Sequence, residues 1–230
     1  MSARRPWLVP FGVLFGGAAA LRAALYERGI LPRARLQGPV ISVGNLRVGG
    51  TGKTPLVLRC AEILRDEGVP VSILSRGYGG AFRGECLVVG DGISVLATSA
   101  EAGDEPVMLA RALPGVVVAV GPRRDRVGKA VESRFGPRVH LLDDGFQHLR
   151  LARDLNLLCV GSGDLGEWPL PAGDLREFPS ALRRADLVFT PKGEAESLLG
   201  PERTFRLGRR VLGFFTLEGY PRPTPARPFL

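Results

Sequence analysis

The sequence predicts an α/β fold in which a parallel sheet carries helices on both of its faces. From residue 39 onward, short apolar segments alternate with stretches whose apolar residues recur at helical period. A strand without a polar face has to be covered on both sides, which is the situation of strands in parallel sheets. The chain has 230 residues, of which 45% are hydrophobic and 23% charged, so it can bury a core of ordinary size.

The first segment, residues 6–21, reads PWLVPFGVLFGGAAAL and holds no charged side chain. It is short for a transmembrane helix, which needs about 20 apolar residues. It also has the form of a secretory signal, or of the first core helix of a soluble protein. We favour an apolar helix that associates with a membrane surface, because arginines flank it and would lie near anionic head groups. These are Arg4, Arg5, Arg22, Arg28, Arg33 and Arg35.

The next two elements are the first strand and the first helix of the sheet domain. Val40–Val43 predicts a buried strand, and Pro55–Glu67 predicts a helix that stops at Gly68. Its apolar residues at helical spacing are Leu56, Cys60, Ile63 and Leu64.

The remaining elements follow in alternation along the chain. One arm of a hairpin is expected at Cys86–Val89, before the turn residues 90–92. Helices are expected at Asp104–Leu113 and Arg124–Phe135, and strands at Val69–Leu74, Val116–Val120, Val139–Leu142, Leu155–Val160 and Leu187–Thr190.

The strongest local signal is the segment GGTGKT between the first strand and the first helix. This is the context of a phosphate loop (P-loop), so we predict a P-loop NTPase-like sheet. Glycines let backbone N–H groups surround phosphate oxygens, and the helix N-terminus adds partial positive charge. Lys53 would reach the β- and γ-phosphates of ATP, and the hydroxyl of Thr54 would bind Mg²⁺. The predicted nucleotide-binding residues are Gly49, Gly50, Thr51, Gly52, Lys53 and Thr54.

The loop also bears on two alternatives raised by its surroundings. The alternative interpretation of GGTGKT is a plain glycine turn between strand and helix. Arg47 stands where the strict motif has glycine. ATP is cytosolic, so an exported protein could not use the loop. The loop therefore argues against a secretory signal and for the membrane-surface helix.

Two adjacent acids, Asp143 and Asp144, follow the apolar strand Val139–Leu142. A carboxylate at the end of a neighbouring strand is what a phosphate loop needs to hold Mg²⁺. Adjacent side chains point in different directions, so one acid could hold the metal while the other meets a water or a base partner. We place Asp143 with Thr54 at the metal and Asp144 with Lys53 among the catalytic residues, although a mere turn is the alternative.

Asp104 and Glu105 open a predicted helix. Acids in a first turn interact favourably with the helix dipole, which would explain them structurally. One of them could instead accept a proton from an attacking hydroxyl. The spacing leaves both interpretations open.

Further polar residues follow strand ends, where an open parallel sheet faces its ligand. They lie in the loop SRGYGG, in the arginine cluster around Asp125, and directly after the acidic pair. Each could equally be a solvated surface residue. The candidates for substrate binding are Arg76, Tyr78, Arg123, Gln147 and His148.

Composition excludes several classes of protein. Cys60, Cys86 and Cys159 lie far apart, which excludes a disulfide framework and a zinc cluster, and two histidines are too few for a histidine-rich metal site. The net charge is +8, but residues 1–36 hold six Arg and one Glu, and residues 200–230 hold six Arg and two Glu. The rest of the chain is close to neutral, unlike a nucleic-acid binder.

Taken together, ISVGNLRVGGTGKTP, SRGYGG, GDEP, DDGFQH and PAGDLRE occur in the order found in the tetraacyldisaccharide 4′-kinase family, which the chain resembles over residues 7–190. The resemblance implies transfer of the γ-phosphoryl group of ATP, with Mg²⁺, to the 4′-hydroxyl of a tetraacylated glucosamine disaccharide 1-phosphate, which gives lipid IVA. It implies that Lys53 and Thr54 bind ATP and Mg²⁺, that Asp104 is the catalytic base, and that Asp143 and Asp144 are the Walker B acids. It also implies a site at the cytoplasmic face of the inner membrane.

The expected organisation is a membrane-associating segment at residues 1–36, a P-loop kinase domain at 37–200, and a remnant of a second lobe with a Pro/Arg-rich tail at 201–230. Asp174 and Phe178 differ from the prolines usual in the family, and no histidine follows His148, although the family's second lobe supplies one. A P-loop switch ATPase and a truncated, non-catalytic family member are therefore the alternative functions. The sequence leaves the oligomeric state open.

Overall fold

The computed structural model describes residues 5–50, 52–191, 195–208, 214–215 and 221–222. Thr51, one of the predicted loop residues, lies outside this set. So does most of the Pro/Arg-rich tail.

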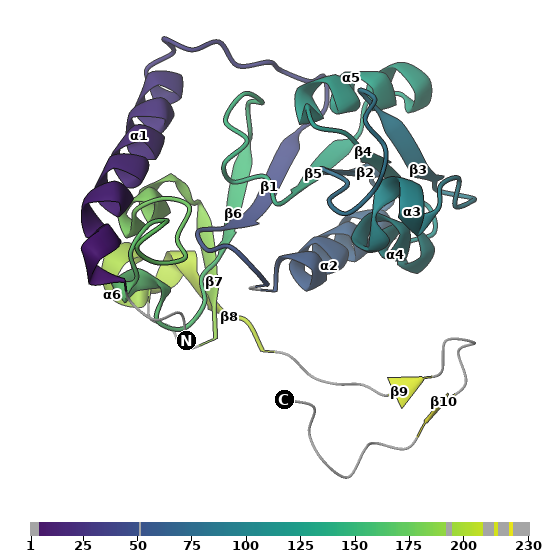
Figure 1. The fold of residues 1–230 in the computed structure, drawn as a ribbon. Coiled ribbons are helices and arrows are strands. Elements are labelled where there is room, and N and C mark those ends of the chain that lie inside the picture. Colours follow the sequence, from purple (N-terminus) through teal and green to yellow (C-terminus); the bar gives the residue numbers. More distant parts are fainter. Residues whose placement is uncertain (1–4, 51, 192–194, 209–213, 216–220, 223–230) are drawn as a thin grey trace.

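The described residues form a twisted sheet with strand order β3-β4-β2-β5-β1-β6-β7-β8 (Figure 1). All neighbouring strands are parallel except β3 and β4, which are antiparallel. The strands are β1 (Val40–Asn45), β2 (Val71–Ser75), β3 (Leu87–Asp91), β4 (Val117–Val120), β5 (Val139–Asp143), β6 (Leu155–Cys159), β7 (Leu187–Thr190) and β8 (Thr204–Arg206).

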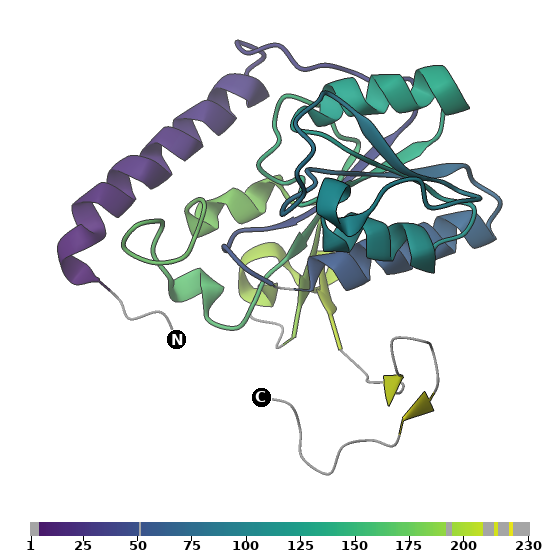
Figure 2. The ribbon, with the colours of Figure 1, turned by 45° about the vertical axis from the view of Figure 1, so that its right-hand side comes forward.

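Helices cover both faces of the sheet, as predicted (Figures 1 and 2). The longer ones here are α2 (Lys53–Asp66), α4 (Asp104–Ala112) and α5 (Arg124–Phe135). Neighbouring strand residues divide between the faces: Ile73 packs in the core under α2 and α4, whereas Leu74 packs in the core under α5. Because side chains alternate along a strand, wholly apolar strands supply both cores.

Short helical segments complete the fold. They are α3 (Ser99–Ala102), α6 (Glu196–Leu199) and the 3₁₀ helices η1 (Pro6–Leu8), η2 (Asp164–Gly166), η3 (Pro179–Arg184) and η4 (Pro201–Arg203).

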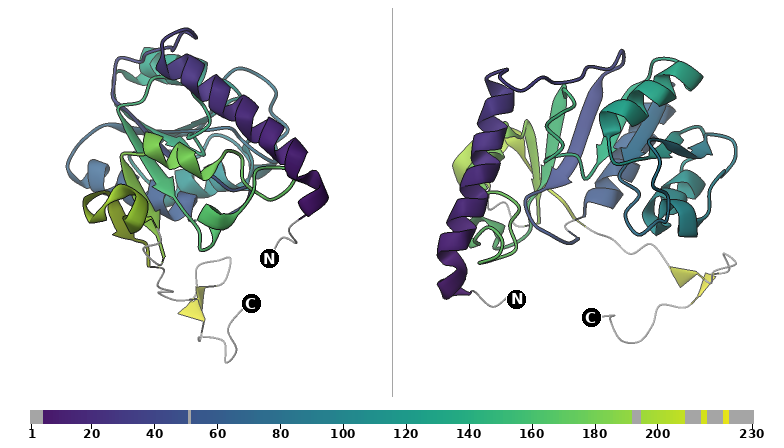
Figure 3. Two further views of the ribbon diagram at one scale, coloured as in Figure 1. Left: turned by 90° about the vertical axis from the view of Figure 1, so that its left-hand side faces the viewer. Right: turned by 45° about the horizontal axis from the view of Figure 1, so that its top comes forward.

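The N-terminal helix α1 (Val9–Glu27) stands at one side of the sheet, outside the main layers (Figure 3). Only Gly12, Gly16, Ala23 and Tyr26 are buried along it. A side chain on Gly12 would approach the carbonyl oxygen of Pro169 to 2.9 Å, so the helix rests closely on the body. Its other faces expose Phe11, Leu14, Phe15 and Leu21, and Trp7, just before the helix, is exposed as well.

This exposure argues against the core-helix alternative for the N-terminal segment. Among the described residues, 6–27 form the one helix that is long and apolar enough to cross a membrane, judged by length and composition. The predicted apolar N-terminal helix is therefore present.

Two predicted details differ in the structure. The hairpin arm expected at Cys86–Val89 is β3, and the turn after it folds back so that Gly90 bridges antiparallel to Val95. The strand that pairs along the length of β3 is, however, β4, which follows α3 and α4 in the chain. In the tail, residues 220–228 are too rich in proline for the sequence to predict a helix or a strand, yet Pro221–Arg222 (β10) pairs antiparallel with Phe214–Phe215 (β9). Proline is tolerated in such short edge strands.

The division of the chain at residue 200 stays a prediction. Beyond that point, β8 pairs with β7 at the edge of the main sheet.

Candidate active site

The predicted site residues lie at one edge of the sheet because β1, β2, β4 and β5 are parallel and adjacent. Their carboxyl ends therefore meet. The glycine-rich loop follows β1, Arg76 follows β2, Pro122 follows β4, and Asp143 closes β5. This edge is where open α/β sheets bind ligands.

The glycine-rich loop leads directly into the N-terminus of α2. Gly49 and Gly52 have φ values of 111° and 90°, a region that side chains with a β-carbon rarely adopt. Lys53 is the first residue of α2, and its Nζ donates to the carbonyl oxygen of Gly49 at 3.1 Å. The same Nζ lies 3.5 Å from Oδ1 of Asp144. The loop thus joins a helix N-terminus and a cation, both of which attract phosphate.

A second group of oxygen atoms includes those of Thr54, Glu105 and Asp143. Oγ1 of Thr54 donates to Oε1 of Glu105 at 3.1 Å, which links α2 to the first turn of α4. Asp143 is buried and accepts a hydrogen bond from Ser75 Oγ at 3.3 Å. Burial, then the nearby charges of Glu105 and Asp144, raise the pKa of Asp143 to about 6.

These oxygens match the donor set that Mg²⁺ prefers, namely carboxylate and hydroxyl. No three His, Cys, Asp or Glu side chains in the described part of the chain cluster closely enough to hold a metal among themselves. A cation here would therefore share the protein's oxygens with those of a ligand and of water, which is the usual coordination of Mg²⁺ beside phosphates.

Asp144 occupies an unusual position between two cations. Its φ of 53° is the only positive value of a non-glycine residue among those described. Nη1 of Arg176 donates to both of its carboxylate oxygens, at 2.9 and 2.8 Å. Gln147 accepts from the same nitrogen at 3.3 Å and donates to the carbonyl oxygen of Asn45 at 2.9 Å. Asp144 is thus held between Lys53 and Arg176.

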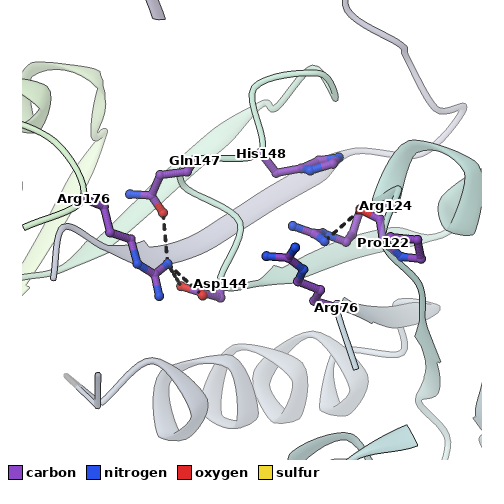
Figure 4. A pocket seen from close by; sticks show the side chains of 7 residues that line it. All are labelled: Arg76, Pro122, Arg124, Asp144, Gln147, His148 and Arg176. Carbon is purple, nitrogen blue, oxygen red and sulfur yellow. Dashed lines mark hydrogen bonds and ion pairs between the residues drawn. The ribbon is translucent and has the colours of Figure 1, made fainter. Parts of the chain in front are cut away.

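A pocket of about 240 Å³ opens beside Asp144 (Figure 4). It is lined by Arg76, Pro122, Arg124, Asp144, Gln147, His148 and Arg176. Three arginines and one carboxylate face it, so the pocket is positively charged and suited to an anion.

Burial and neighbouring charges lower the pKa values of two side chains that line the pocket. Burial, then the charge of Arg76, lower the pKa of Arg124 to about 10. Burial, then the charge of Arg124, lower the pKa of His148 to about 4. His148 is therefore neutral at pH 7, while Arg124 keeps its charge.

The structure brings together most of the predicted residues but not all of them. Tyr78 is 89% exposed, and Arg123 turns back to Asp125, with Nη2 2.6 Å from Oδ2. Neither lines the pocket, so their proposed substrate contacts stay predictions. Asp104 is exposed at the start of α4. The preceding Gly103 packs so closely on the loop after β2 that a Cβ would lie 2.3 Å from the carbonyl oxygen of Tyr78.

Sequence reasoning did not assign two residues of the site. Glu105 was weighed together with Asp104 as a proton acceptor, and spacing could not tell the two adjacent acids apart. Arg176 comes from residues 168–178, far along the chain from the loop. The stretch PAGDLRE contains it, but only the fold carries that stretch to Asp144.

Comparisons with known proteins show the family of this chain. The sequence matches the family Tetraacyldisaccharide-1-P 4′-kinase over residues 4–212. The tetraacyldisaccharide 4′-kinase of Geobacter metallireducens is 47% identical over 92% of this chain and 64% of its own length. That of Anaeromyxobacter dehalogenans strain 2CP-C is 47% identical over 91% of this chain and 56% of its own.

A solved structure is also similar. The crystal structure of LpxK from Aquifex aeolicus, described as an "apo" form in complex with ATP, is 41% identical and superimposes with a TM-score of 0.80 over 88% of this chain and 64% of that one. The chain thus spans 56–64% of the length of these relatives. The family match nonetheless covers most of its residues, which confirms the resemblance, and the chain belongs to the tetraacyldisaccharide-1-P 4′-kinase family.

Proposed function

We propose that this chain is an ATP-dependent kinase that phosphorylates the 4′-hydroxyl of a tetraacylated glucosamine disaccharide 1-phosphate to form lipid IVA. The observation that carries the proposal is the meeting of the phosphate loop, Lys53 and the acids Asp143 and Asp144 at one sheet edge, beside an arginine-lined pocket. That arrangement can hold a nucleoside triphosphate next to a second, anionic molecule.

ATP would be held by the loop amides of residues 49–54 and by Lys53. The related Aquifex LpxK structure contains ATP, which supports this assignment. Mg²⁺ would be held by Thr54 and Asp143, with Glu105 close by. When bound, the metal neutralises charge that develops on the transferred phosphoryl group. Lys53 contributes further positive charge at the same phosphates.

The acceptor would enter the arginine-lined pocket. Arg76, Arg124 and Arg176 suit the phosphate of an anionic sugar, and neutral His148 and Gln147 can hydrogen-bond to sugar hydroxyls. Asp104, the exposed residue before Glu105 at the start of α4, would accept the proton of the attacking hydroxyl.

The exposed apolar helix α1 would bring the site to its lipid substrate. Its apolar side chains and the flanking arginines suit the surface of an anionic membrane, so we place the protein at the cytoplasmic face of the inner membrane.

The test is one assay with the full chain, γ-labelled ATP and the disaccharide lipid acceptor, with and without Mg²⁺. We expect label in the lipid only with Mg²⁺, and none from a Lys53→Met variant. Lys129→Met, on the exposed side of α5, is the matched control and should transfer label like the parent.

Other outcomes would contradict the proposal. Release of free phosphate without labelled lipid would indicate a switch ATPase instead. Neither product would indicate a non-catalytic member of the family.

A further inference from the structure

Arg47, which stands where a strict phosphate loop has glycine, makes two ion pairs. Its Nη2 lies 2.7 Å from Oδ2 of Asp174, and its Nη1 lies 3.3 Å from Oδ1 of Asp164. The Asp164 side chain is fully buried, while those of Arg47 and Asp174 are about a third exposed. Arg47, which precedes the glycine-rich loop, therefore pairs with residues more than a hundred positions later in the chain. Asp174 belongs to residues 168–178, which are called the segment below.

Backbone hydrogen bonds reinforce this connection. The N–H of Val48 donates to the carbonyl oxygen of Asp174 at 2.9 Å, and the N–H of Arg176 donates to that of Leu46 at 2.6 Å. Arg47 and Leu175 form an antiparallel bridge between them. Residues 174–176 are thus bound through their backbone to residues 46–48.

The two residues that flank Leu175 make the side-chain contacts. Asp174, whose carbonyl oxygen accepts from Val48, pairs with Arg47. Arg176, whose N–H donates to Leu46, pairs with Asp144 in the site. One residue separates the two contacts along the chain, so fixing the first restricts the second.

The same segment is held at its far end by the N-terminal helix. Phe178 packs against Gly16 of α1 so closely that a Cβ there would lie 2.6 Å from its ring. Arg176 therefore lies between two residues of the segment that are held in place, Asp174 and Phe178.

We propose that Arg47 and Asp174 are positioning residues that hold Arg176 against Asp144. With Arg176 in place, the negative charge of Asp144 is balanced beside Lys53 and the phosphate loop. With Arg176 displaced, that charge would repel the phosphates of a nucleotide. The effect on the nucleotide rests on the proposed function; the effect on the segment does not.

The best variant is Asp174→Asn. Arg47→Met would leave the buried carboxylate of Asp164 without its cation, which commonly prevents stable folding. Asp174→Asn removes one charge and keeps the shape and the backbone bonds of the segment. Glu62→Gln is the matched control, because Glu62 forms a surface ion pair with Arg59 on α2.

The first measurement follows the segment without any nucleotide. The chain has two tryptophans, Trp7 and Trp168, and Trp168 lies in the segment, where its carbonyl oxygen accepts from Leu175 at 3.1 Å. In a Trp7→Phe background, fluorescence therefore reports Trp168 alone. We expect acrylamide to quench Trp168 more strongly after Asp174→Asn and equally after Glu62→Gln.

The second measurement is a double-mutant cycle on the dissociation constant of Mg-ATP, measured by calorimetry. Asp174→Asn should weaken binding by about fivefold in the parent. In an Arg176→Met background, the same substitution should change binding by less than about 1.5-fold, because the residue it positions is gone.

Each result decides something. Unchanged quenching of Trp168, or an equal loss of affinity in both backgrounds, would overturn the positioning role. If the parent chain binds no Mg-ATP, the proposed function fails, and the quenching result alone then decides whether the ion pair holds the segment.

Discussion

Replacing Asp143 by Asn should make the protein more stable at neutral pH while removing its function. Asp143 is 4% exposed, and its pKa rises from 3.8 to about 6 because the charged form is buried beside other acids. A carboxylate whose pKa is higher in the folded state favours folding at low pH. That contribution is lost as the pH rises from 3.8 through about 6.

The size of the effect follows from the shift. A rise in pKa from 3.8 to about 6 corresponds to at most about 3 kcal/mol of folding free energy lost by the parent at neutral pH. Asn has the same shape but does not ionise, so the variant never buries a negative charge at this position. Its free energy of unfolding therefore does not fall in this way as the pH rises. The free energy of unfolding of Asp143→Asn, minus that of the parent, should therefore increase between about pH 4 and pH 7 and then level off.

The assay is urea unfolding of the full chain over that range of pH. Only the difference between variant and parent is informative, because His148 acts in the opposite direction. Its lowered pKa contributes stability above about pH 6.5 that is lost as the pH falls toward 4. Asp66→Asn, on the surface of α2, is the control for the loss of one carboxyl group. A difference for Asp143→Asn that is flat, or that falls as the pH rises, would refute the reasoning.

Three further predictions concern the loop, the base and the N-terminal helix. Thr54→Ser should keep Mg²⁺-dependent nucleotide binding and Thr54→Val should lose it by at least about tenfold in calorimetry, because only the hydroxyl can bind the metal; equal affinities would contradict that role. Asp104→Asn should keep the affinity for ATP and lower label transfer by about a hundredfold or more, and full transfer would remove its role as base. Gly16→Leu should collide with Phe178 and lower the melting temperature, whereas Gly17→Leu, which meets no atom within 4 Å, should not; equal melting temperatures would show that α1 is not seated as described.

Much of the fold could be predicted because its strands are almost entirely apolar. Strand and helix positions from Val40 to Thr190 agree with the expected ones to within about two residues in most cases. The pairing of β3 was missed, since a short apolar run gives no sign of its partner. Its partner β4 is separated from it by two helices.

The candidate site, like the fold, was predicted from the sequence only in part. Lys53, Thr54, Asp143 and Asp144 were found because they stand next to a strand end in a short local pattern. Glu105 and Arg176 were not assigned, since their significance depends on contacts between distant segments.

The sequence by itself determined the class of sheet, the phosphate loop and the family, because each depends on residues close together in the chain. The tertiary structure alone decided that Asp144 is held between Lys53 and Arg176, and that Arg47 pairs with Asp174. It also decided that α1 leaves most of its apolar surface exposed. Electrostatic pairing and burial depend on distances in space, and residues that are 32 to 127 positions apart in the chain acquire those distances only when the chain folds.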